Sequence, residues 1–285
     1  MNVKHLIVLA AAAAAALGGL SLTSAGGAAI AAESAQTTGL PQLTIAMNGS
    51  SISVGGALDS GAVDVVSTTT QKAQGEPWLV RLNPGVTPEQ ALAFLGTRAA
   101  RDLNNTGRIG SIVFAAEADK GVSHVQTSLE PGQYLAIDVA GNNPAKFAHT
   151  SFTIGQAAQP AALPTPQATI KALDFAFRGP RTLHTGELVR FENDGFLVHM
   201  FVATEAANAK TAPEVVKALR AGNDQKARRL SIGGVVFANP VSPGAAQQLK
   251  VTAKPGYWVL ACFMTTQDGR EHTQLGQERI VHIVP

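Results

Sequence analysis

The two halves of this sequence repeat the same order of short motifs, and this repeat limits the fold more than any other feature. Thr87 and Thr211 each open a Thr-x-x-Gln or Thr-x-x-Glu pattern, and they lie 124 residues apart. Pro131 and Pro255 each begin a Pro-Gly-x-aromatic turn, at the same spacing of 124 residues. A Val-Phe-Ala run also recurs between them, at an offset of 123. A series of motifs at a nearly constant offset indicates two copies of one folding unit.

Each half consists mainly of short apolar runs separated by turns that contain Gly or Pro, which is the pattern of β-strands. The expected strands are 43–47, 63–67, 78–82, 111–115, 134–139 and 152–154, then 168–172, 186–191, 196–204, 234–238, 258–263 and 279–283. Thr87 and Thr211 each open a capping box, which predicts one short helix per half. One helix cannot supply the crossovers of a parallel sheet. We therefore predict an all-β protein of two tandem Greek-key β-sandwich domains, with one short helix inserted per domain.

The sequence divides into a leader, two domains and a linker. Residues 1–32 begin with Met-Asn-Val-Lys-His and continue as an apolar, Ala- and Leu-rich run, which predicts a secretory signal peptide cleaved after Ala31 or Ala32. An uncleaved membrane anchor is the alternative. Residues 38–155 and 168–285 are the predicted domains, and residues 156–167, with three prolines among Ala and Gln, form a semi-stiff linker. We expect the protein in the periplasm or outside the cell.

Cys262 is the only cysteine, so no disulfide can form within the chain. In an exported protein this leaves a buried inert thiol, an intermolecular bridge or a metal ligand. The formal net charge is +2, charged residues make up 15%, and no basic block occurs, so nothing favours a nucleic-acid partner. No nucleophile elbow, phosphate-binding glycine loop or His-Glu-x-x-His motif occurs either, so we do not expect an enzyme.

Residues of the second half follow one another in the order typical of a mononuclear copper site. Asn193 precedes His199, a Pro-Gly-Tyr-Trp-x-x-x-Cys strand ends at Cys262, His272 follows ten residues later, and Gln277 five beyond that. This series resembles the cupredoxins, blue-copper proteins such as plastocyanin, azurin and stellacyanin, and the resemblance covers the whole second domain. The resemblance implies that His199, Cys262 and His272 are equatorial copper ligands and that Gln277 is the axial ligand.

The sequence departs from the cupredoxin pattern in two places. The separation of ten positions between Cys262 and His272 makes a longer loop than in plastocyanin, and we expect an Asp268-Gly269 turn to bring this loop back. Gln277 stands where methionine is usual, as in stellacyanin-like proteins, and Met264 is a competing axial candidate. The remaining histidines of the mature chain, which we expect to be structural or exposed, are His124, His149, His184 and His282.

A thiolate, two imidazoles and a weak axial ligand suit copper in both oxidation states. The sequence therefore predicts an exported type 1 copper-binding protein with one copper, in the second domain, for single-electron transfer with a redox partner protein or for copper carriage. In the first domain Asp138 takes the place of Cys262 and residues 78–81 offer no histidine, so we expect no copper there. The alternative is a metal-free β-sandwich binding or structural module with a buried thiol. A two-domain copper oxidase or reductase is not favoured, because no His-x-His pair occurs.

Overall fold

The computed structural model describes residues 39–70, 75–118, 122–141 and 143–285. The predicted signal peptide, its cleavage site at Ala31 or Ala32, and residue 38 at the start of the first domain lie outside these ranges. Among the residues described, no helix has the length and apolar character needed to span a membrane. Strands dominate these residues and are organised in packed sheets, which confirms the predicted all-β class.

The first half, residues 39–155, packs two layers of strands face to face. One layer holds β1 (Gln42–Met47), β2 (Ile52–Gly56), β3 (Gly61–Thr69) and β6 (Val122–Leu129). The facing layer holds β4 (Pro77–Leu82), β5 (Gly110–Ala115), β7 (Gly132–Asp138) and β8 (Ala148–Ile154). Leu43 and Ile45 from β1 and Leu79 and Phe114 from the other layer are fully buried between them. In β1 alternate residues thus point into the core, as the period-two pattern predicts.

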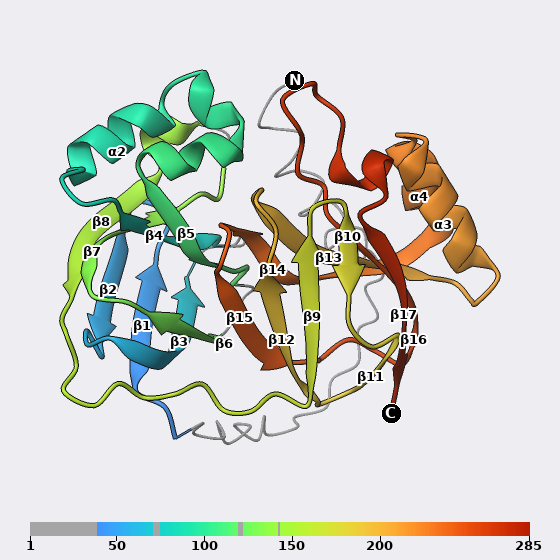
Figure 1. The fold of residues 1–285 in the computed structure, drawn as a ribbon, viewed down its shortest axis with the longest axis horizontal. Helices are drawn as coiled ribbons and strands as arrows, with labels where there is room; N and C mark the ends of the chain where they lie inside the picture. The colour runs from blue at the N-terminus through green and yellow to red at the C-terminus, as the bar shows by residue number, and fades with distance from the viewer. Residues whose placement is uncertain (1–38, 71–74, 119–121, 142) are drawn as a thin grey trace, which may run out of the picture.

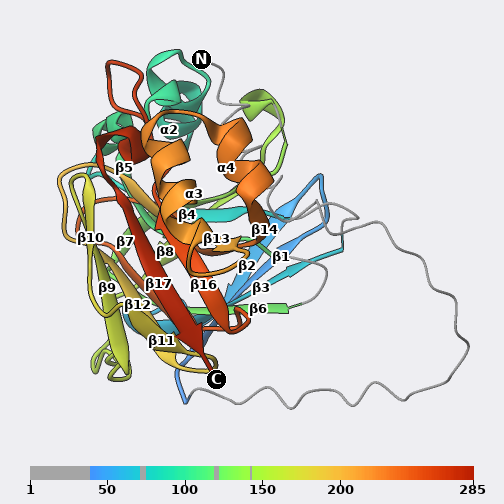
Figure 2. The same ribbon diagram turned by 90° about the vertical axis from the view of Figure 1, so that its right-hand side faces the viewer.

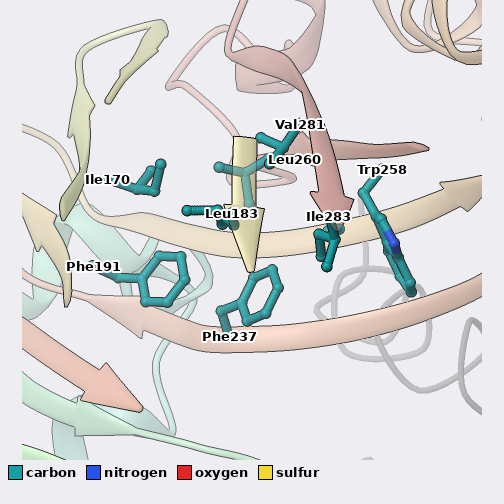
Figure 3. A pocket seen from close by; sticks show the side chains of 9 residues that line it. Ile170, Leu183, Phe191, Phe237, Trp258, Leu260, Val281 and Ile283 are labelled. Carbon is teal, nitrogen blue, oxygen red and sulfur yellow. The ribbon is translucent and has the colours of Figure 1, made fainter. Parts of the chain in front are cut away.

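The second half, residues 168–285, has the same two-layer arrangement. One layer holds β9 (Ala168–Leu173), β10 (Ala176–Arg178), β12 (Leu188–Asn193) and β15 (Ala246–Lys250). The five-stranded sheet opposite holds β11 (Thr182–His184), β13 (His199–Ala206), β14 (Ser231–Val241), β16 (Gly256–Ala261) and β17 (Glu278–Val284). Figure 3 shows Phe191, Phe237 and Trp258 among the nine residues that line a small pocket between these layers. All nine are hydrophobic, and the cavity volume is about 10 Å³, room for roughly one water molecule, so this pocket is part of the packed core rather than a ligand site.

The helix of the first half, α2 (Pro88–Leu95), begins at the predicted capping box. The Gln90 N–H donates to Thr87 Oγ1 at 3.3 Å, and the Thr87 N–H donates to Gln90 Oε1 at 2.9 Å. A 3₁₀ segment, η2 (Leu103–Arg108), follows it and leads back to β5. Figure 1 shows these elements together above the sheets of the first half.

The second half carries two helices, α3 (Thr211–Arg220) and α4 (Asp224–Leu230), one more than predicted. Both pack on strands of the five-stranded sheet and lie over its outer face (Figure 2). The predicted capping box at Thr211 is wrong, because Thr211 does not cap α3. Its N–H donates instead to Asn208 Oδ1 at 3.1 Å, so an upstream Asx-type bond starts the helix.

The two halves lie side by side and share a sheet (Figure 1). β6 pairs antiparallel with β15, so that eight strands run in the order β10-β9-β12-β15-β6-β3-β1-β2. A second junction joins β5 to the end of β14: the Ser242 N–H donates to Ile112 O and the Ile112 N–H donates to Ser242 Oγ, both at 2.9 Å. Residues 156–167 contain neither strand nor helix. Because the sheet continues across both halves, the predicted domain boundaries stay an interpretation.

Candidate metal centre

His199 is the first residue of β13. The strand expected over 196–204 therefore begins only at residue 199. The turn before it is held by Asn193 at the end of β12. The Asn193 side chain donates to Leu197 O at 2.9 Å and accepts the Gly195 N–H at 3.0 Å. Asn193 and His199 are both fully buried. A fixed backbone therefore presents the His199 side chain at one end of the sandwich.

Cys262 directly follows β16, the strand that pairs with β13. Its N–H donates to Gln277 O at 3.2 Å, and its Sγ accepts the Met200 N–H at 3.4 Å. The residue is fully buried. Main-chain groups of two neighbouring segments therefore fix the position of the sulfur, and the N–H bond to Sγ favours the thiolate form.

The loop from Cys262 to His272 turns back on itself, as the Asp268-Gly269 pattern predicts. Thr265 forms a β-bridge with Glu271, and the Thr266 N–H donates to Arg270 O at 2.9 Å. Gly269 has a φ of 84°, which glycine adopts without strain. The His272 N–H then donates to Met264 O at 2.8 Å, and η4 (His272–Leu275) begins. The additional residues form a hairpin excursion, and His272 returns to the level of Cys262.

Side-chain atoms of His199, Cys262 and His272 converge, and all three side chains are fully buried. Cys262 Sγ lies 3.7 Å from His199 Nδ1 and 3.4 Å from His272 Nδ1, and the two Nδ1 atoms are 3.2 Å apart. A point equidistant from the three atoms lies about 2.0 Å from each, close to protein metal–nitrogen and metal–sulfur bond lengths. In the part of the chain that the structure describes, no other group of three histidine, cysteine or carboxylate side chains converges within 4.8 Å.

The two axial candidates differ in how they meet this cluster. Gln277 is fully buried, and its Nε2 donates to Leu173 O at 3.1 Å. Burial lowers the pKa of both His199 and His272, and the Gln277 side chain is close enough to oppose the shift at each. Its buried Oε1 has no hydrogen-bond partner among the described residues. Met264 is also buried. Its main-chain N–H donates a hydrogen bond to Cys262, and its C=O accepts one from the His272 N–H. Gln277 thus places a buried side-chain oxygen beside the two imidazoles.

Burial also governs the charge of the three converging groups. It raises the pKa of Cys262 to about 12, and it lowers the pKa of His272 to about 4, with His199 adding to that shift. Burial lowers the pKa of His199 as well, against the effect of Asp174. Without a cation the cluster is therefore a neutral thiol beside two neutral imidazoles at pH 7. A metal ion can bind only when the thiol proton leaves.

Sequence reasoning missed two polar residues that hold the segment of His199. Asp174, in the turn between β9 and β10, accepts a hydrogen bond from His199 Nε2 at 3.0 Å. Asn104, in η2 of the first half, accepts a hydrogen bond at Oδ1 from the N–H of Val198 at 2.7 Å. Val198 directly precedes His199 in the chain. Neither residue belongs to a spacing motif, because each contact depends on segments that come together only in the folded chain.

The first half holds a counterpart of this arrangement without the same donors. Asp138 ends β7, as Cys262 follows β16, and its Oδ1 accepts the Glu76 N–H at 3.0 Å. The Met200 N–H makes the corresponding bond to Cys262 Sγ in the second half. A carboxylate thus occupies the thiol position in the same backbone setting, as the sequence repeat predicts.

Comparisons with known proteins give distant structural likenesses only. No family model matches the chain, and no curated protein matches it. Among solved structures, a reduced auracyanin from Roseiflexus castenholzii is 21% identical over 41% of this chain and 95% of its own, with a TM-score of 0.25. Auracyanin A from Chloroflexus aurantiacus, a "blue" copper protein, is 15% identical over 41% and 96%, with a TM-score of 0.25. A copper-containing nitrite reductase from Thermus scotoductus is 11% identical over 86% and 68%, with a TM-score of 0.24. Likenesses this distant carry no argument about function.

Proposed function

We propose that this chain is an exported type 1 copper protein that binds one copper ion in its second half and transfers single electrons. The observation that carries the proposal is the triangle of His199 Nδ1, Cys262 Sγ and His272 Nδ1, with edges of 3.2, 3.4 and 3.7 Å. Its centre lies at bonding distance from all three donors. Donor atoms from three separate segments therefore surround a single point.

The donor set selects copper over other common metals. One thiolate and two imidazoles in a trigonal arrangement, with a weak oxygen or sulfur ligand along the axis, suit copper in both oxidation states. Structural zinc sites instead use four strong ligands in a tetrahedron. Gln277 would supply the weaker fourth ligand through Oε1, because its side chain is buried beside both imidazoles. When bound, copper supplies a one-electron couple.

The chain's own residues favour electron transfer over catalysis. His199, Cys262, His272 and Gln277 are each 0% exposed, so a substrate has no direct access to the donors. The donors come from β13, from the end of β16 and from the loop before β17, and main-chain hydrogen bonds fix each of them. A ligand set that moves little between oxidation states allows fast electron exchange. Copper carriage, which needs an open route for release, fits this closed site less well.

The location and partner follow from the same proposal. A lone cysteine that keeps its sulfur for a metal is compatible with an oxidising compartment, since no second cysteine is present to pair with it. The predicted signal peptide at residues 1–32 would deliver the chain there. A redox partner protein is then required, because a closed site of this kind exchanges electrons with another carrier.

The test is the metal content of the full chain. Metal-free protein is incubated with Cu(II), freed of excess ion and analysed for metal per chain, with Zn(II) in parallel. We expect one copper in the native protein and in His149→Ala, which changes an exposed histidine outside the site. We expect none retained in Cys262→Ala or His272→Ala. Copper retained equally by all four proteins, or by none, would support the metal-free β-sandwich instead.

A further inference from the structure

The turn between β9 and β10 touches three of the four candidate ligands with three consecutive residues. Leu173 O accepts from Gln277 Nε2 at 3.1 Å, and Asp174 Oδ1 accepts from His199 Nε2 at 3.0 Å. The Phe175 ring meets the His272 ring edge-on, with centroids 5.2 Å apart. No sequence motif assigns these residues a role. Their convergence suggests that the turn holds the ligands in place.

Phe175 has an unfavourable backbone conformation. Its φ is 64°, and it is the only residue other than glycine with a positive φ in the described part of the chain. For a bulky side chain this left-handed conformation is unfavourable, and surrounding contacts must maintain it. Phe175 lies beside the three converging side chains of His199, Cys262 and His272. Its contacts there, rather than the conformational preference of phenylalanine, therefore set the backbone of the turn.

Asp174 is held from the other side by the loop that precedes His199. The Phe196 N–H donates to Asp174 Oδ1 and Oδ2 at 3.0 and 3.2 Å, and the Leu197 N–H donates to Oδ1 at 3.2 Å. Gly195 allows this close approach: a Cβ there would lie 2.5 Å from Asp174 Oδ1 and 2.7 Å from His199 Nε2. Two backbone donors and a glycine therefore aim this carboxylate at the imidazole.

We propose that Asp174 is the positioning residue for His199, fixing its Nε2–H tautomer so that the Nδ1 lone pair faces the centre of the ligand triangle. A carboxylate accepts hydrogen bonds, so the imidazole proton lies on Nε2. Nδ1 is then the free donor, 3.7 Å from Cys262 Sγ and 3.2 Å from His272 Nδ1. His272 has no equivalent support, since its buried Nε2 lacks a hydrogen-bond partner among the described residues.

The consequence for copper rests on the proposed function. A carboxylate behind a ligating histidine orients the ring and increases its basicity, and loss of such a partner costs about 10–100-fold in metal affinity. A more basic imidazole stabilises Cu(II) relative to Cu(I). Asp174 therefore strengthens Cu(II) binding and lowers the reduction potential of the site.

The experiment compares Asp174→Asn and Asp174→Ala with Asp194→Asn in the full chain. Asp194 is a matched control, because it is a partly exposed aspartate in the loop that precedes His199. Its carboxylate pairs with Lys171 rather than with a histidine. Imidazole ¹⁵N chemical shifts of the metal-free proteins report the His199 tautomer without any metal. Thermal melting of the metal-free proteins checks that each variant folds. Cu(II) affinity and reduction potential are then measured.

We expect Asp174→Ala to shift the His199 tautomer equilibrium and to weaken Cu(II) binding about 10–100-fold. Asp174→Asn keeps an acceptor oxygen but not the charge, so we expect retained binding with a higher potential. Asp194→Asn should match the native protein in every readout. An unchanged tautomer in folded Asp174→Ala overturns the proposal for Asp174. A native protein that binds no copper would defeat the proposed function but leave the tautomer result standing.

Discussion

Cys262 Sγ lies 3.4 Å from His272 Nδ1, although nine residues separate the two in the chain. The hairpin around Gly269 takes up the extra length, and the His272 N–H bond to Met264 O closes the loop. A long loop therefore does not prevent convergence when its middle folds as a hairpin. The relationship also implies that the thiol and the imidazole share any cation that binds between them.

Replacing Gln277 should change the reduction potential. In Gln277→Met a thioether replaces the amide oxygen, and the softer donor favours Cu(I), so we expect the potential to rise. Met264→Leu is the control, because Met264 bonds the site through its backbone, and its potential should stay near the native value. Voltammetry of the copper-loaded proteins gives both values. A shift in Met264→Leu alone would make Met264 the axial ligand.

Copper uptake should release a proton. The pKa of Cys262 is raised to about 12 by burial, so Sγ is protonated at pH 7, whereas His272, with a pKa lowered to about 4, is already neutral. Each Cu(II) should therefore displace about one proton between pH 6 and 8, and affinity should weaken as pH falls. Calorimetry in buffers of different ionisation enthalpy counts the protons. Uptake with no proton release would mean that the thiol is not a ligand.

Asn104 should couple the two halves. In Asn104→Ala the Val198 N–H, on a residue only 3% exposed, loses its acceptor, which costs about 1–3 kcal/mol in the free energy of unfolding. Asn105→Ala is the matched control, because Asn105 bonds Ala99 O within the same half. Urea unfolding of the full chain compares the two. An equal decrease in the free energy of unfolding for both variants would mean that the Asn104–Val198 contact between the halves adds no stability beyond that of a contact within one half.

Glu76 should make the protein less stable as pH rises. Burial, with help from Glu117 and Asp138, raises the pKa of Glu76 from 4.5 to about 8. The folded state then keeps a proton that the unfolded chain loses above pH 4.5, so stability falls between about pH 4.5 and 8. Glu76→Gln imitates the protonated form and should remove this dependence, whereas Glu89→Gln, at an exposed position, should not. Parallel pH slopes for native protein and Glu76→Gln would refute the assignment.

The features predicted correctly from sequence are those set by local chemistry. The repeated Pro-Gly turn places Gly132 and Gly256 at the start of β7 and β16, with φ values of 146° and 159° that suit glycine. The capping box at Thr87 is local in the same sense. At Thr211 the same motif misleads, because Asn208 offers a competing acceptor three residues upstream. Local rules therefore locate α2 and α3 and most of the strands, but they miss the cap of α3, the helix α4 and the strands β2, β6, β10, β11 and β15.

The parts of the site that escaped prediction depend on contacts distant in sequence. Asp174 reaches His199 because β9 pairs in parallel with β12, which places Ala172 opposite Asn193. Asn104 reaches Val198 because the first half docks beside the second. By contrast, His199, Cys262, His272 and Gln277 follow a one-dimensional spacing that sequence alone records. Spacing identifies donors, whereas the groups that orient them emerge only from strand pairing.

The most direct test of the account is a titration of metal-free full-length protein with Cu(II), followed by visible absorption. Bonding between Cu(II) and a cysteine thiolate gives an intense visible charge-transfer band. We predict that this band grows to saturation at one copper per chain and is absent in Cys262→Ser, while His149→Ala behaves as the native protein. A colourless native protein at saturating Cu(II), or an equal band in Cys262→Ser, would contradict the proposed copper site.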